Sequence, residues 1–174
     1  FGEQFMRYIG LFVLLIMCLP ARAEIIQSSA DHYTLRQEAT SELPPDQLWQ
    51  RLINPQNWWH PDHTYSGSAE HLSLDPVAGG VWAERWDGNS VIHGTVVNVM
   101  TGSMLRLDAP FGPLQEQAIH AVWTITIEAH ESGSKVTFNE VATGSSASGL
   151  EELAKAVDYV KTEAMSRLVA TKSK

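Results

Sequence analysis

Three polar residues of this sequence could form an acid–base site. Glu84, His93 and His120 each lie in a segment expected to form a strand. If their side chains all point inward, they form a polar cluster in an apolar cavity, where burial raises the pKa of the carboxyl and a nearby imidazole can exchange protons with it. Such a pair suits the cyclisation, dehydration or isomerisation of a carbonyl compound.

The same residues also have a structural interpretation. A buried glutamate that accepts hydrogen bonds from histidine or tryptophan N–H groups would hold neighbouring strands in register. Perturbed titratable groups occur in structural networks too, so we prefer this interpretation and keep catalysis as the alternative. Alternation places Trp82 and Trp86 on the same side of their strand as Glu84. Strand alternation alone does not show which side of the strand faces the interior of the protein. A β-bulge would also change which residues share a side.

A second polar group lies in the segment 58–65, Trp-Trp-His-Pro-Asp-His-Thr-Tyr. His60 and His63 have the spacing of a chelating pair, and the aspartate between them adds an oxygen donor. The proline between them disfavours a regular helix, and a closed zinc site would need more ligands, of which His71 is the nearest candidate. We therefore assign no metal site and predict structural or surface roles for these histidines.

Large aromatic side chains accompany both polar groups and could form an apolar binding surface. The candidate ligand-binding residues are Trp58, Trp59, His60, His63, Tyr65, Trp82, Trp86 and Phe111. Because tryptophan buries a large area, Trp49, Trp58 and Trp59 also have an interpretation as core residues. The loop 110–115 around Phe111 either closes over a cavity as a lid or connects two strands rigidly.

Composition and motifs exclude several classes of partner. The sequence has no glycine-rich phosphate loop, nucleophile elbow or paired-cysteine metal motif, so we expect no cofactor. The chain has a net charge of −8, and no basic run follows residue 23. Nucleic acid and anionic membrane surfaces are therefore not expected as partners.

Residues 1–23 have the layout of a secretory signal peptide. A start at Met6 with one positive charge precedes an apolar run at 9–19, and a small-x-small cleavage site follows at 21–23. The residues before Met6, 1–5, could lie upstream of the true start. The apolar run is shorter than the roughly 20 residues that a membrane span needs.

Cleavage after Ala23 would remove Cys18, the one cysteine of the chain. Lipidation of this cysteine is disfavoured because a methionine precedes it. The mature chain would then have no disulfide, no thiolate chemistry and no stable membrane anchor. We therefore expect an exported protein, periplasmic or secreted.

The mature chain divides into a polar lead-in at 24–32 and one domain at 33–170. A strand at 33–40 opens the domain, and a short helix begins at Pro44-Pro45-Asp46. An antiparallel meander follows, with strands expected at 72–75, 81–86, 91–100, 104–109, 118–129 and 135–142. The domain ends in a long helix whose apolar stripe is Leu150, Leu153, Val157, Val160, Ala164 and Leu168.

Short motifs occur along the domain in a definite order. They are Pro44-Pro45-Asp46-Gln47-Leu48-Trp49, Asn54-Pro55, Trp58-Trp59, Leu74-Asp75-Pro76, Gly79-Gly80, Glu84, His93-Gly94-Thr95-Val96, Met104-Leu105-Arg106-Leu107 and Gly112-Pro113-Leu114. This ordered set resembles the START-like (SRPBCC) superfamily, in particular its polyketide cyclase and heat-shock-chaperone ATPase activator-like branch.

The resemblance implies an α+β helix-grip fold, in which a curved antiparallel sheet wraps around a long C-terminal helix and leaves a ligand cavity. It implies binding of a small hydrophobic or amphipathic molecule. Since only some members are enzymes, a cofactor-free cyclase, dehydratase or isomerase using Glu84 with His93 or His120 is the alternative. The chaperone named in the branch is cytosolic, so the expected export argues against a chaperone partner.

Overall fold

A computed structural model describes residues 22–171, so positions 1–21 of the expected signal peptide lie outside the described residues. The strands are β1 (Arg22–Ser29), β2 (His32–Ser41), β3 (Leu72–Leu74), β4 (Val81–Trp86), β5 (Asn89–Met100), β6 (Met104–Asp108), β7 (His120–His130) and β8 (Gly133–Thr143). The α-helices are α1 (Pro45–Leu52), α2 (Pro113–Glu116) and α3 (Leu150–Val169), and the 3₁₀ turns are η1 (Pro55–Asn57), η2 (Pro61–His63), η3 (Ala69–His71) and η4 (Ser146–Ser148).

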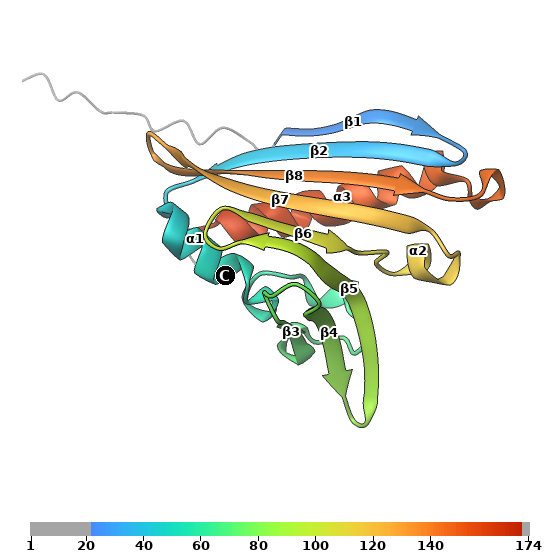
Figure 1. Cartoon of the computed structure of the whole chain (residues 1–174), viewed down its shortest axis with the longest axis horizontal. Coiled ribbons are helices and arrows are strands. Elements are labelled where there is room, and N and C mark those ends of the chain that lie inside the picture. The colour runs from blue at the N-terminus through green and yellow to red at the C-terminus, as the bar shows by residue number, and fades with distance from the viewer. Residues whose placement is uncertain (1–21, 172–174) are drawn as a thin grey trace, which may run out of the picture.

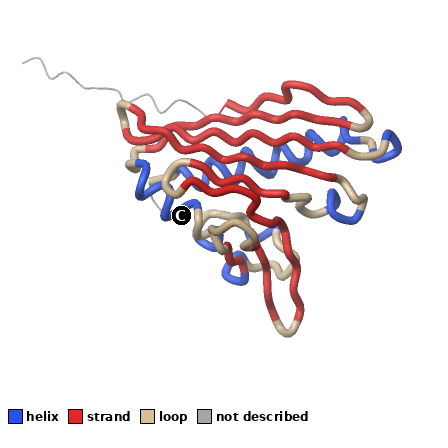
Figure 2. Tube along the Cα trace, viewed as in Figure 1, coloured by secondary structure: helices blue, strands red, loops and turns tan. Residues whose placement is uncertain are grey.

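All eight strands belong to one antiparallel sheet in the order β1-β2-β8-β7-β6-β5-β4-β3. The sheet curves, and α3 lies along one of its faces behind β2, β8 and β7 (Figures 1 and 2). This arrangement is an α+β helix-grip fold, which confirms the predicted fold class. Within residues 22–171, no helix is long and apolar enough to span a membrane.

The segment expected as a polar lead-in at 24–32 largely forms β1, an edge strand. Its backbone pairs with β2 from Arg22 opposite Glu38 to Ser29 opposite His32. An edge strand is stabilised by these backbone hydrogen bonds and needs little side-chain burial, so its sequence lacks the apolar alternation by which strands are recognised.

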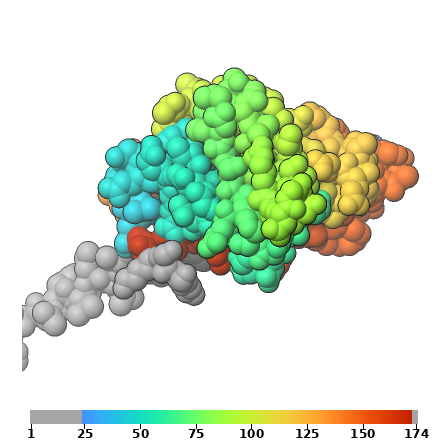
Figure 3. All heavy atoms as spheres, turned by 90° about the horizontal axis from the view of Figure 1, so that it is seen from below, coloured from blue at the N-terminus to red at the C-terminus, as the bar shows by residue number. Residues whose placement is uncertain are grey.

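The connection between β4 and β5 is a tight hairpin turn, Asp87-Gly88. Asp87 and Gly88 have φ angles of 44° and 80°, as a two-residue turn with left-handed central residues requires. The chain from η1 to β5, blue-green to green, covers the middle of the face seen in Figure 3.

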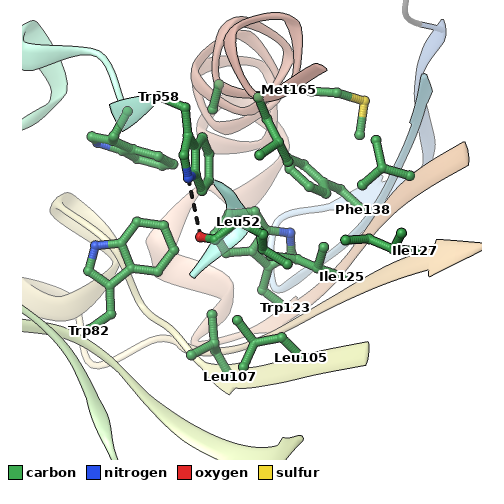
Figure 4. Packing of buried hydrophobic residues seen from close by; sticks show 14 of the residues in the cluster. Leu52, Trp58, Trp82, Leu105, Leu107, Trp123, Ile125, Ile127, Phe138 and Met165 are labelled. Atoms are coloured by element: carbon green, nitrogen blue, oxygen red, sulfur yellow. Dashed lines mark hydrogen bonds between the residues drawn. The ribbon is translucent and has the colours of Figure 1, made fainter. Parts of the chain in front are cut away.

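The core between the sheet, α1 and α3 is rich in tryptophan (Figure 4). Trp58, Trp82 and Trp123 are fully buried, and Trp58 packs edge-on against Trp82 at 5.7 Å between ring centroids. The indole N–H of Trp58 donates to the carbonyl oxygen of Leu52 at 3.2 Å. Trp49 and Trp59, each 3% exposed, belong to the same cluster, so the core interpretation of Trp49, Trp58 and Trp59 is confirmed.

Candidate functional site

A partly open pocket of about 420 Å³ lies between α3 and the loops that follow η2 and β6. Its lining is Trp59, His63, Thr64, Tyr65, His93, Phe111, Gly112, Pro113, Leu114, Glu116, Glu140, Leu153, Ala156, Val157, Val160 and Lys161. Small-molecule sites commonly have volumes of about 300–1,000 Å³ and apolar walls with a few polar groups.

One wall of the pocket is the middle of α3. Leu153, Val157 and Val160 belong to the apolar stripe predicted for this helix, yet they are only partly buried. Their exposed surface faces the pocket instead of the sheet. The predicted stripe is thus shared between core packing and the pocket.

Four predicted ligand-binding residues line the pocket: Trp59, His63, Tyr65 and Phe111. His93, predicted as part of the acid–base cluster, lines it too. Trp58 and Trp82 lie in the core instead, where Trp82 packs edge-on against Phe111 at 5.2 Å between centroids. Trp86 lies at the far end of β4, beside the hairpin tip, and is not part of the lining. The loop holding Phe111 contains a short helix, α2, that the sequence did not indicate.

His120 does not join Glu84 and His93. Along β7 the odd-numbered positions Ala121 and Trp123 are buried, and His120 lies at an even-numbered position. Its side chain therefore points to the outer face of the sheet. There its side chain is 64% exposed, and Nδ1 lies 3.2 Å from Oδ1 of Asp108. His120 is therefore excluded from the acid–base cluster considered from the sequence.

Glu84 and His93 form a buried pair behind the pocket. The carboxylate of Glu84 is fully buried and accepts hydrogen bonds from His93 Nε2 at 3.0 Å, from the Tyr65 backbone N–H at 3.0 Å and from the Ser66 backbone N–H at 2.5 Å. Burial alone would raise the pKa of Glu84, but the hydrogen bonds from Ser66, Tyr65 and His93 outweigh it and hold the pKa below its ordinary value. The raised pKa expected from the sequence is thus not found, and Glu84 is ionised at neutral pH.

His93 reaches this pair through a bulge in β5. Trp82 pairs with Gly94 and the next residue, Ala83, pairs with Ile92, so His93 is the extra residue between them. Burial lowers the pKa of His93, against the opposing effect of Glu84, so the ring is neutral at pH 7. Because a carboxylate only accepts hydrogen bonds, Nε2 is assigned the proton and Nδ1 is left as a proton acceptor.

Acid is expected to destabilise the protein through Glu84 and His93. Both have pKa values below their ordinary 4.5 and 6.5, so the unfolded chain binds protons before the folded chain does. Their contribution to the free energy of unfolding is fully present above pH 6.5, the ordinary pKa of histidine. It is lost as the pH falls through the lowered pKa of each group. Urea unfolding between pH 7 and pH 4 should therefore show a smaller loss of stability for the Glu84→Gln/His93→Gln variant than for the wild type. Equal pH dependence of the two proteins would refute this origin of acid sensitivity.

The structure adds a buried ion pair that the sequence interpretation missed. Lys161 of α3 is 3% exposed, and its Nζ contacts Oε2 of Glu140 on β8. The other carboxylate oxygen of Glu140 accepts from the Tyr33 hydroxyl at 2.6 Å. Nζ also lies 3.2 Å from the ring centroid of Trp123, a cation–π contact. Burial lowers the pKa of Lys161 to about 8, although Glu140 opposes this shift.

His60 and His63 lie outside the Glu84–His93 pair, at the rim of the pocket. Together with Glu163 of α3 they form a group whose potential ligand atoms all lie within 4.8 Å of one another. His71, the further ligand considered from the sequence, instead contacts the Ser66 hydroxyl through Nδ1 at 2.8 Å.

Solved structures share this fold. Protein Ms6760 from Mycobacterium smegmatis matches with a TM-score of 0.60 and 18% identity, over 89% of this chain and 99% of that chain. CalU16 from Micromonospora echinospora matches with a TM-score of 0.55 and 15% identity, over 86% and 80%. Protein CV1439 from Chromobacterium violaceum matches with a TM-score of 0.55 and 15% identity, over 81% and 98%. No family model and no curated protein matches the chain.

Identities this low show the fold and leave the activity to be argued from the site. The matches cover 81–89% of this chain. The chain therefore shares the helix-grip fold of these solved structures.

Proposed function

We propose that this chain is an exported protein that binds a small hydrophobic or amphipathic molecule in the pocket beside α3. The observation that supports this most strongly is the lining: aliphatic side chains of α3 face Trp59 and Phe111, and few polar groups interrupt them. Apolar walls with a small number of placed polar groups are typical of ligand sites in proteins.

The polar groups of the pocket indicate which molecules fit. Lys161 and Glu140 neutralise one another, and His93 is neutral at pH 7. The remaining acidic residue of the lining, Glu116, is exposed to solvent, so a charge carried deeper into the pocket would lose its hydration without gaining an unpaired counter-charge. The preferred ligand is therefore an uncharged apolar body with a carbonyl or hydroxyl group that reaches His93 or Lys161.

Export belongs to the proposal because of the signal-peptide layout of residues 1–23. The ordered motifs from Pro44 to Leu114 resemble those of the polyketide cyclase-like branch of the START-like superfamily, which supports the proposal of a ligand-binding cavity. Activation of a cytosolic chaperone is not part of the proposal, since an exported protein would not meet it.

Filling the pocket from α3 should abolish binding. Val157→Trp places an indole on the pocket wall, and Ser166→Trp places the same side chain on an exposed position of the same helix. In titrations followed by the fluorescence of Nile red, an uncharged apolar dye, we expect Val157→Trp to weaken dye binding by at least about tenfold, equivalent to about 1.4 kcal/mol. Ser166→Trp should bind like the wild type. Equal dye affinity in all three proteins, each with cooperative unfolding, would place the dye elsewhere and contradict a binding pocket.

A cofactor-free cyclase, dehydratase or isomerase is the second candidate, and the 3.0 Å contact between Glu84 and His93 favours it. In that case His93 Nδ1 is the general base, and Glu84 positions the ring and sets its tautomer. Deuterium exchange at the α-carbon of β-tetralone, followed by NMR, tests this candidate. An enzyme should accelerate the exchange in the wild type and lose the acceleration in His93→Gln without losing affinity for the ketone.

A further inference from the structure

We propose that His60, His63 and Glu163 bind a divalent transition-metal ion, with zinc as the best match to the ligand set. Two neutral imidazoles and one carboxylate are the protein ligands of open zinc sites, in which a water or another small ligand takes the fourth position. The site lies at the rim of the pocket, because His63 is also part of the pocket lining.

The local backbone explains why the two histidines point the same way. The proline between them prevents a regular α-helix, but Pro61–His63 forms the 3₁₀ turn η2 with His60 as its N-cap residue. A 3₁₀ helix has about three residues per turn, so side chains at positions i and i+3 are eclipsed. The rings of His60 and His63 accordingly lie side by side, with centroids 5.5 Å apart.

Glu163 supplies the third ligand from the opposite element. Its Oε1 lies 3.5 Å from Nε2 of His60, and its Oε2 lies 2.8 Å from Nε2 of His63. Donor atoms of a tetrahedral zinc site stand about 3.4 Å apart when the bonds are about 2.1 Å long. The two contacts, one to each carboxylate oxygen, lie on either side of that value, and one donor atom from each of the three residues lies within 4.8 Å of the others. Side-chain rotations would have to bring the three donors to the spacing of a bound ion.

Exposure of the three side chains permits an ion to enter. His60, His63 and Glu163 have side chains that are 24%, 22% and 30% exposed. The cluster is therefore open to solvent. Its residues are held in place because the two histidines belong to the turn η2 and its N-cap, and Glu163 belongs to α3.

A neighbouring carboxylate can support His60 as a ligand. In the structure, Nδ1 of His60 accepts from the backbone N–H of Asp62 at 3.1 Å, and a carboxylate oxygen of Asp62 lies 3.8 Å from the same nitrogen. A metal at Nε2 would require the ring proton on Nδ1, so the hydrogen bond from the Asp62 backbone N–H would be lost. A rotation of the exposed Asp62 side chain would bring its carboxylate into position to accept from Nδ1 instead, as carboxylates commonly do for metal-bound histidines.

Calorimetric titration of the purified full chain with Zn²⁺ tests the proposal. The wild type should bind one Zn²⁺ per chain. His60→Ala, His63→Ala and Glu163→Gln should each weaken binding by more than about tenfold, because even the loss of an outer partner of a metal ligand costs about tenfold or more. His130→Ala, which removes an exposed histidine at the turn between β7 and β8, is the matched control and should bind like the wild type.

Thermal unfolding with and without Zn²⁺ gives a second measurement, because an ion that binds the folded state raises the melting temperature. Zn²⁺ should stabilise the wild type and His130→Ala but not Glu163→Gln, which keeps the size of the side chain. The proposal is overturned if the wild type binds no Zn²⁺, or if the binding persists in Glu163→Gln and in the double variant His60→Ala/His63→Ala. Binding at this cluster does not require an occupant in the pocket, so loss of dye binding in Val157→Trp leaves it unchanged.

Discussion

Replacing Lys161 with methionine is expected to lower the free energy of unfolding by about 3–5 kcal/mol, the usual cost of breaking a buried ion pair from one side. The variant leaves the Glu140 carboxylate, which is 2% exposed, without its cation. It also removes the cation that lies over the ring of Trp123. Urea unfolding at pH 7 measures the difference.

Two companion variants separate the charge pair from the loss of a long side chain. Lys161→Met/Glu140→Leu removes both charges and should recover part of the lost stability, since apolar replacements of buried ion pairs are often neutral or stabilising. Recovery stays incomplete because the buried Tyr33 hydroxyl loses its acceptor. Lys155→Met breaks the exposed contact with Glu152 on the same helix and should change stability by less than about 1 kcal/mol. A Lys161→Met variant as stable as Lys155→Met would show that the pair does not form in solution.

Replacing Trp82 with alanine is expected to cost about 3–5 kcal/mol, the usual range for removing a buried tryptophan. Trp82 is fully buried and packs against Trp58, Trp59 and Phe111. Trp59 and Phe111 line the pocket. Removal of the Trp82 indole leaves a cavity behind these two side chains, so they should become more mobile and the affinity for the dye should fall. Thermal and urea unfolding measure the first effect, and dye titration measures the second.

Trp86→Ala is the matched control for Trp82→Ala. It removes the same side chain from the same strand, but at the partly exposed end near the hairpin tip. Its cost in stability should be clearly smaller, and its dye affinity should equal that of the wild type. Similar losses in the two variants would mean that the core is not centred on Trp82.

The helix-grip fold could be predicted because local signals agree with tertiary structure. The left-handed turn at Asp87 and Gly88 defines one hairpin, and the buried alternation of Trp123, Ile125 and Ile127 on β7 matches the pattern expected of a strand with one buried face. Among the strands of the described residues, β1 was missed, because its stability comes from backbone pairing with β2 instead of from buried side chains.

The site was harder to predict because it depends on contacts between distant segments. His93 enters its pair with Glu84 through a bulge, and strand alternation does not locate bulges. Glu163 is about a hundred residues from His60 and His63 in the chain, and its contact with them follows only from the way α3 packs.

The pair of Lys161 and Glu140 did leave a signal in the sequence. Glu140 lies between Phe138 and Ala142 on the buried face of β8, where strand alternation calls for apolar residues. Lys161 falls four residues from Val157 and three from Ala164, within the apolar stripe of the last helix. One charged residue of each sign on two buried faces indicates an internal ion pair.

Native mass spectrometry of the purified protein tests the central proposal, ligand binding in the pocket, most directly. We predict that the wild type and Ser166→Trp retain a small molecule of defined mass that organic solvent extracts, and that Val157→Trp lacks it. The extracted molecule should bind again to the emptied wild type. A mass equal to that of the bare chain in all three proteins, together with no uptake of apolar molecules from a lipid extract, would contradict the proposal.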